Sequence, residues 1–241
     1  MGMLPLLAFF LLASLPTANF DLNRTNANLS EPFLTPTSVT SGNFKLLGSY
    51  ILDGLVFAQP IYVEKITTSG QTHNLVIIAT LNNSVFAFDA DAPGSAPVWS
   101  NLAFATAFSG YPIVGAALYS SPIGCLSTPV ADIPNSKLYV VCDTVVGSTP
   151  NWIIRQLDLT TGATLITTTI SGQVTGTGDP GGGDTTSGPN LLFFPKQEFQ
   201  RTGLTLANGN VYIGFSSPSD VRPYHGWIMA YSTSTLTQTA I

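Results

Sequence analysis

Short apolar runs separated by turn residues make up most of the chain beyond its N-terminal apolar stretch. Runs of Val, Ile, Thr, Tyr and Phe alternate with Gly, Pro, Asn and Asp, and helix signals are almost absent. This pattern predicts an all-β protein.

Three segments of the chain repeat one plan of strand, short loop, strand, turn and strand. They cover residues 74–101, 137–170 and 210–241. A short strand is expected before each of them, at residues 58–63, 126–131 and 201–207. A four-stranded antiparallel sheet that recurs along a chain is the sequence signature of a β-propeller blade. We therefore expect a β-propeller of about three to four such blades, forming an incomplete ring, over residues 43–241.

The repeat also resembles a known family. The stretches VFAFDAD followed by VW, and LYVV followed by RQLDLTTG, resemble the repeat of quinoprotein-type propellers. DGLVFAQPIYV, QRTGLTLANGNVYIGF and PYHGW look closer still to a secreted, mostly uncharacterised branch with pyrroloquinoline-quinone-like (PQQ-like) propellers. The resemblance implies a ring of roughly seven or eight blades, of which this chain supplies an N-terminal part.

Residues 49–54 (SYILDG) look like the lone outer strand that closes such a ring against its last blade. An open sector would leave strand faces unburied and edges unpaired. Two readings follow: the sequence is a piece of a longer propeller, or copies of the chain close the ring by self-association.

The N-terminal residues form an apolar run that ends in small residues. The run is short for a membrane span, and polar, Asn-rich sequence follows. Residues 1–19 are therefore predicted to be a cleaved signal peptide, followed by a polar segment at 20–42. The alternative is an uncleaved membrane anchor, and no other segment is apolar enough to span a membrane. A signal peptide predicts a secreted, extracellular or periplasmic protein.

Charge and cysteine content narrow the possibilities. Only 9% of the residues are charged, the net charge is −5, and no Lys/Arg cluster occurs, which argues against nucleic-acid binding. Cys125 and Cys142 flank an expected strand–turn–strand centred on Ile133–Pro134. They would fall opposite each other and form a disulfide, although a slip of one or two residues would separate them.

The expected long loops point to one face. In a blade, the connections 102–125 and 171–199 lie on the same side as the loops between second and third strands, and functional residues usually lie on such loops. The candidate ligand-binding residues at this face are Gln59, Ser127, Arg201, Tyr224 and His225.

Each candidate has two readings. Gln59, Ser127 and Arg201 open the innermost strands, where they would bind a small anion or sugar, or satisfy loop carbonyls around the ring. His225 would anchor its loop or contact a ligand at the rim. Asp179 and Asp184, in GTGDPGGGD, are interpreted as part of a flexible loop rather than a calcium site.

Signatures of catalysis are mostly missing. The chain has no GxSxG, HExxH or CxxC motif and only two histidines, so no catalytic residue, metal site or cofactor is assigned. Quinone dehydrogenases bind PQQ with calcium-ligating acids and often adjacent cysteines, and no such set can be placed here. The leading hypothesis is a non-catalytic binding or scaffolding module for an unknown small molecule or protein.

Two enzymes remain as alternatives. One is a PQQ- and calcium-dependent oxidoreductase relative. The other is a carbohydrate-active enzyme, which is disfavoured because Glu198 alone among the Glu residues lies in a long loop of this face.

Overall fold

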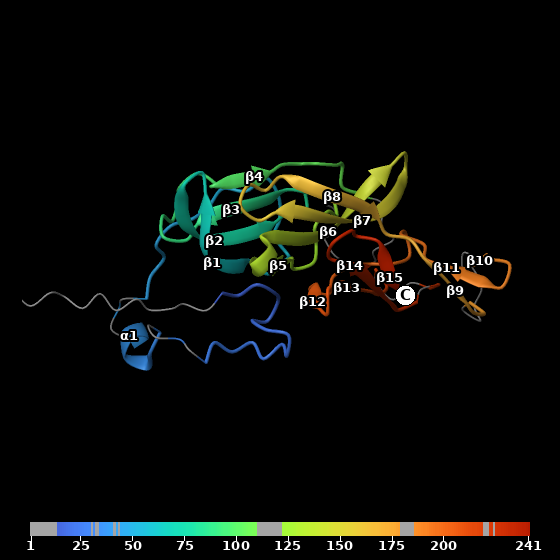
Figure 1. The fold of residues 1–241 in the computed structure, drawn as a ribbon, viewed down its shortest axis with the longest axis horizontal. Coiled ribbons are helices and arrows are strands. Elements are labelled where there is room, and N and C mark those ends of the chain that lie inside the picture. Colours follow the sequence, from blue (N-terminus) through green and yellow to red (C-terminus); the bar gives the residue numbers. More distant parts are fainter. Residues whose placement is uncertain are drawn as a thin grey trace, which may run out of the picture.

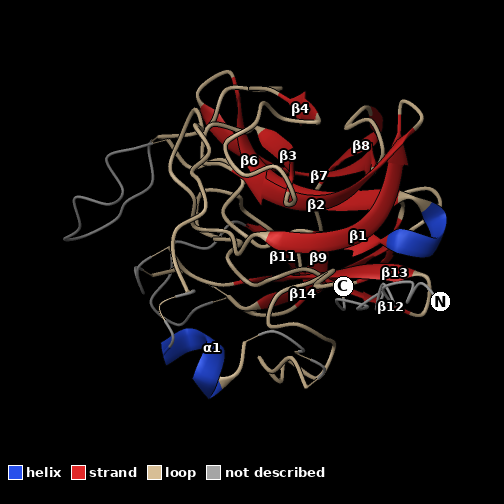
Figure 2. Ribbon diagram, turned by 90° about the vertical axis from the view of Figure 1, so that its left-hand side faces the viewer, coloured by secondary structure: helices blue, strands red, loops and turns tan. Residues whose placement is uncertain are grey.

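The computed structural model describes residues 14–29, 31, 34–40, 42, 44–109, 122–178, 186–218, 222–223 and 225–241. Apart from the short helix α1 (Pro36–Thr40) and a 3-10 turn η2 (Ile133–Asn135), the regular structure in these residues is β. The prediction of an all-β protein is confirmed. Helix α1 lies apart from the strands and has no buried residue (Figure 2).

Three four-stranded antiparallel sheets follow one another along the chain, each with its strands in chain order (Figure 1). Sheet 1 contains β1 (Ile61–Thr68), β2 (Gln71–Ala79), β3 (Val85–Asp89) and β4 (Trp99–Asn101). Sheet 2 contains β5 (Val130–Asp132), β6 (Lys137–Val146), β7 (Thr149–Asp158) and β8 (Thr164–Thr169). Sheet 3 contains β12 (Thr205–Ala207), β13 (Asn210–Phe215), β14 (Trp227–Ser232) and β15 (Gln238–Ala240).

A small sheet interrupts this series within the connection between sheets 2 and 3. It contains β9 (Gln173–Thr175), β10 (Thr186–Ser187) and β11 (Asn190–Leu192), in the order β10-β11-β9. Its Leu191 is buried and belongs to the apolar cluster shared by sheets 2 and 3. Part of the long loop that the sequence predicts at 171–199 is therefore ordered β structure.

The inner strands of sheet 2, β5, β6 and β7, are largely buried, and β6 is covered on both faces. Leu138 and Val140 of β6 belong to an apolar cluster that sheet 2 shares with sheet 1. Tyr139 and Val141, which alternate with them, belong to the cluster shared with sheet 3. Because side chains alternate between faces along a strand, a strand covered on both sides needs a continuous apolar run. This explains LYVV in β6.

The disulfide predicted between Cys125 and Cys142 is present, with a Cα–Cα distance of 4.1 Å. β5 pairs Val130 with Tyr139, yet further along the Asp143 amide donates to the Gly124 carbonyl. Six residues on one side therefore match four on the other. This local offset brings Cys125 beside Cys142, which an unbroken ladder would not do.

Residues 49–54 form no strand. They cover the outer side of sheet 1 through side chains, because the Tyr50 ring stacks on Phe88 with 4.2 Å between centroids. The Tyr50 hydroxyl also donates to the Asp89 carbonyl. The expected outer strand is thus replaced by a segment that packs with its side chains rather than pairing through its backbone.

No helix within the described ranges has the length and apolar character needed to cross a membrane. Residues 1–13, most of the predicted signal peptide, lie outside the described residues.

Candidate functional site

The loop end of sheet 3 brings a buried acid next to His225. Phe199 pairs with Ser216 in an isolated bridge, which fixes Glu198 at the end of β13. The Glu198 side chain is 2% exposed, and its Oε1 accepts a hydrogen bond from the His225 amide at 3.2 Å. This hydrogen bond is made by the backbone of His225, so it positions the loop that carries the imidazole.

Trp152 holds Glu198 from the side of sheet 2. Its indole Nε1 donates to the Glu198 carbonyl at 3.0 Å, and its ring meets Phe199 and Phe215 edge-on. Because Trp152 is fully buried, this corner is a rigid part of the seam between the two sheets.

A hollow of ≈ 240 Å³ opens beside His225. It is lined by Val174, Leu191, His225, Gly226, Trp227, Ile228 and Ile241. Among the described residues that line it, the side chains are mostly aliphatic or aromatic, and His225 is the one ionisable group. Trp227 is 5% exposed, and its indole N–H has no hydrogen-bond acceptor within the described part of the chain. Apolar walls with one or two polar groups are typical of small-molecule sites.

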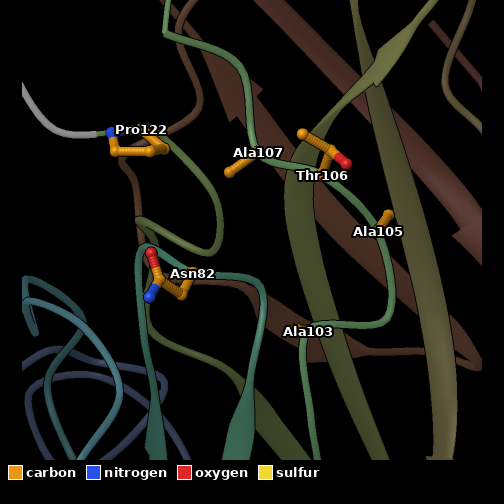
Figure 3. A pocket seen from close by; sticks show the side chains of 6 residues that line it. All are labelled: Asn82, Ala103, Ala105, Thr106, Ala107 and Pro122. Carbon is orange, nitrogen blue, oxygen red and sulfur yellow. The ribbon is translucent and has the colours of Figure 1, made fainter.

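A second hollow of ≈ 270 Å³ lies at the loop end of sheet 1, between the β2–β3 loop and the connection that leads to sheet 2 (Figure 3). It is lined by Asn82, Ala103, Ala105, Thr106, Ala107 and Pro122. None of these side chains is ionisable, and Asn82 already donates to the Asp53 carbonyl. The described residues of this hollow therefore provide no charged group that could bind or react with a ligand.

The predicted site residues are spread over different environments. The backbone N–H of Gln59 donates to Thr128 Oγ1 at 2.9 Å, and the side-chain Oε1 of Gln59 accepts from the backbone N–H of Asn19 at 3.0 Å. Ser127 is buried, and its hydroxyl has no partner among the described residues. Arg201 is exposed. Tyr224 lies outside the described residues, as do Asp179 and Asp184.

One polar pair, His73 with Asp89, was not predicted from the sequence. The His73 Nδ1 and Asp89 Oδ2 atoms are 2.8 Å apart, and both side chains are largely covered. The hydrogen bond from His73 lowers the pKa of Asp89. The signal was the register of β2 and β3, since Leu75 pairs with Asp89 and His73 lies two residues away on the same side.

Arg155 was also missed. It is buried between sheets 1 and 2, where its guanidinium lies 3.5 Å from the centroid of the Phe104 ring and donates to Asn101 Oδ1. Burial lowers its pKa to about 10. Within the described residues it contacts Phe104 and Asn101 on the side of sheet 1 and Thr164 in its own sheet, so it joins the two sheets.

The described residues do not include a set that would bind a metal ion or a quinone cofactor of the PQQ type. Within the described ranges, no three His, Cys, Asp or Glu side chains lie close enough to hold a metal ion. The two cysteines are 17 residues apart in sequence and bonded to each other, unlike an adjacent pair. The described residues therefore do not fit a calcium–PQQ site, and we derive no reaction step through one.

Comparison of the chain with protein-family models and with curated proteins found no match.

Proposed function

We propose that the chain is an exported β-propeller that acts as a binding module without catalysis of its own. The observation that carries the proposal is the series of four-stranded antiparallel sheets, each with its strands in chain order. Successive sheets pack face to face through shared apolar clusters. Repeated sheets with this strand order and face-to-face packing are typical of propeller blades.

The hollow beside His225 is the binding site in this proposal. Its apolar lining favours a small, largely apolar ligand, and the buried Trp227 N–H favours a ligand that carries a hydrogen-bond acceptor. Glu198 and Trp152 would hold the loop that presents His225.

Export is supported by the disulfide, because such bonds persist mainly in oxidising compartments. A PQQ-like family origin and ring closure by copies of the chain stay predictions from the repeat motifs.

Acetophenone and ethylbenzene test the site, since they differ by a carbonyl acceptor. In an NMR titration, acetophenone should shift the Trp227 indole N–H resonance, and ethylbenzene should bind about tenfold more weakly. Ile228→Ser should abolish the shift, because Ile228 lines the hollow and its 73% exposure leaves the fold intact.

Leu165→Ser is the matched control, since Leu165 is 49% exposed on β8, outside the hollow. No Trp227 shift in the native protein, or equal shifts in both variants, would overturn the site. A separate addition of PQQ and calcium chloride, followed by gel filtration, tests catalysis: quinone absorbance retained by the protein would favour the oxidoreductase instead.

A further inference from the structure

Residues 14–24 cross the first strand of each of the three sheets. Leu15 exchanges two backbone hydrogen bonds with Tyr62 of β1, at 2.7 and 3.1 Å. The next carbonyl, of Pro16, accepts from the Ala131 amide of β5 at 2.8 Å. The segment therefore pairs with two sheets as an added strand would.

The same segment is fixed to sheet 3. The Thr17 hydroxyl, 3% exposed, donates to the Leu204 carbonyl at 3.0 Å, directly before β12. Arg24 folds back so that its guanidinium donates to Thr17 Oγ1 at 2.8 Å, to the Leu204 carbonyl at 3.1 Å and to Thr205 Oγ1 at 2.6 Å. One side chain thus ties the segment to itself and to β12.

The sheets leave room for this segment. A Cβ atom at Gly203 would lie 2.5 Å from the Ala18 Cβ, a distance that real side chains do not adopt. Without the segment, the backbone N–H groups of Tyr62 and Ala131 would lose their acceptors, the carbonyls of Leu15 and Pro16, at the edges of β1 and β5. Strand edges of this kind bind extended peptides through backbone hydrogen bonds.

We propose that the edges of β1, β5 and β12 form a binding site for an extended peptide, and that Ser14–Arg24 of the same chain fills it. The site is distinct from the hollow beside His225 and does not depend on the function proposed above. It requires the mature protein to keep Ser14 onward, so any leader ends before Ser14 rather than at residue 19. It also accounts for the hydrogen bond from the Asn19 backbone amide to the Gln59 side chain.

A cleavage experiment on the full chain tests the peptide site. A protease site is placed at Lys45–Leu46, which is exposed, and the chain is cut after folding. The N-terminal fragment should stay bound to the sheets through gel filtration at micromolar concentration. Gly203→Ala should release it, whereas Gly176→Ala should not, because an added Cβ at Gly176 meets no atom within 4 Å. Release of the N-terminal fragment from the cleaved chain that keeps Gly203 would overturn the proposal.

Two further measurements cover the case in which Gly203→Ala fails to fold. By amide hydrogen exchange, Arg24→Ala should speed exchange at Tyr62 and Ala131 by about tenfold or more, while Lys45→Ala, at an exposed cation, should not. Fast exchange at both amides in the native protein would contradict the pairing. The intact mass of the exported protein should show Ser14 retained, and a mature chain that begins at Asn19 or later would exclude the occupied site.

Discussion

Gly162 and Trp99 meet where the β7–β8 turn of sheet 2 packs against the last strand of sheet 1. Asp158 Oδ1 accepts from the amides of Thr160 and Thr161, at 2.8 and 2.9 Å, and so shapes the turn. Gly162 has a φ of +72°, and a Cβ there would lie 2.3 Å from the Trp99 ring. The Trp99 Nε1 donates to the Leu159 carbonyl at 3.1 Å. The glycine therefore serves both the turn and the contact between sheets.

Gly162→Ala should destabilise the protein more than Gly209→Ala. Both positions have a left-handed φ, +72° and +71°, so both alanines carry a similar backbone penalty of about 1 kcal/mol. Only Gly162 faces a side chain, since a Cβ at Gly209 meets nothing within 4 Å. Displacing Trp99 should cost about 1–3 kcal/mol more. Urea denaturation measures the difference in unfolding free energy. Equal decreases in the two variants would show that the Trp99 ring can move aside without cost.

The pair of His73 and Asp89 predicts a loss of stability in acid. The hydrogen bond from His73 depresses the folded-state pKa of Asp89, so the stabilisation is fully present above the unfolded-state pKa of about 3.9. It is lost as the pH falls through the folded-state value. The gap in unfolding free energy between the native protein and Asp89→Asn should therefore narrow from about pH 5 to about pH 3. A gap that stays constant over this range would rule out the carboxylate as its source.

The sequence predicts which strands are present better than it predicts the residues at which they begin. The strand expected at 126–131 is β5, which begins only at Val130, and the one expected at 201–207 is β12, which begins at Thr205. In both sheets the earlier residues pair with an offset, as Phe199 does with Ser216. Apolar spacing cannot reveal such an offset, because it depends on which backbone groups meet across the strands.

Removing the disulfide tests how far it supports sheet 2. It closes a loop with a sequence separation of 17, for which chain-entropy arguments give about 3 kcal/mol. The double variant Cys125→Ala/Cys142→Ala should unfold with a free energy lower by about 2–4 kcal/mol, measured in guanidinium. Thiol titration of the unfolded native protein is the control, and two reactive thiols without reductant would contradict the bond.

Across the molecule, the candidate site was only partly predictable. His225 could be assigned to a loop end from the repeat, because repeats fix the order of strands and loops. Its contact with Glu198 could not, since the two lie 27 residues apart and meet through the offset pairing of Phe199. The covering of Gln59 by residues 14–24 was also hidden, because those residues were assigned to a signal peptide and the polar segment after it.

Sheet 2 belongs to both apolar clusters, which predicts that the three sheets unfold together. Each sheet carries one of the three tryptophans, Trp99, Trp152 and Trp227, so single-tryptophan versions report on each sheet separately. Leu157→Ala, in the cluster shared with sheet 1, should cost about 2–5 kcal/mol.

The denaturation midpoints reported by Trp99 and Trp227 should then fall by the same amount, although Trp227 lies in sheet 3. Leu165→Ala replaces a half-exposed leucine of the same sheet and should lower the unfolding free energy by about 0.5 kcal/mol or less. Both midpoints should therefore stay close to their native values. If the Trp227 midpoint stays at its native value in Leu157→Ala, sheet 3 folds without support from the cluster between sheets 1 and 2. The sheets would then unfold as independent units. In that case neither the shared apolar clusters nor β6, whose side chains belong to both clusters, would make unfolding cooperative.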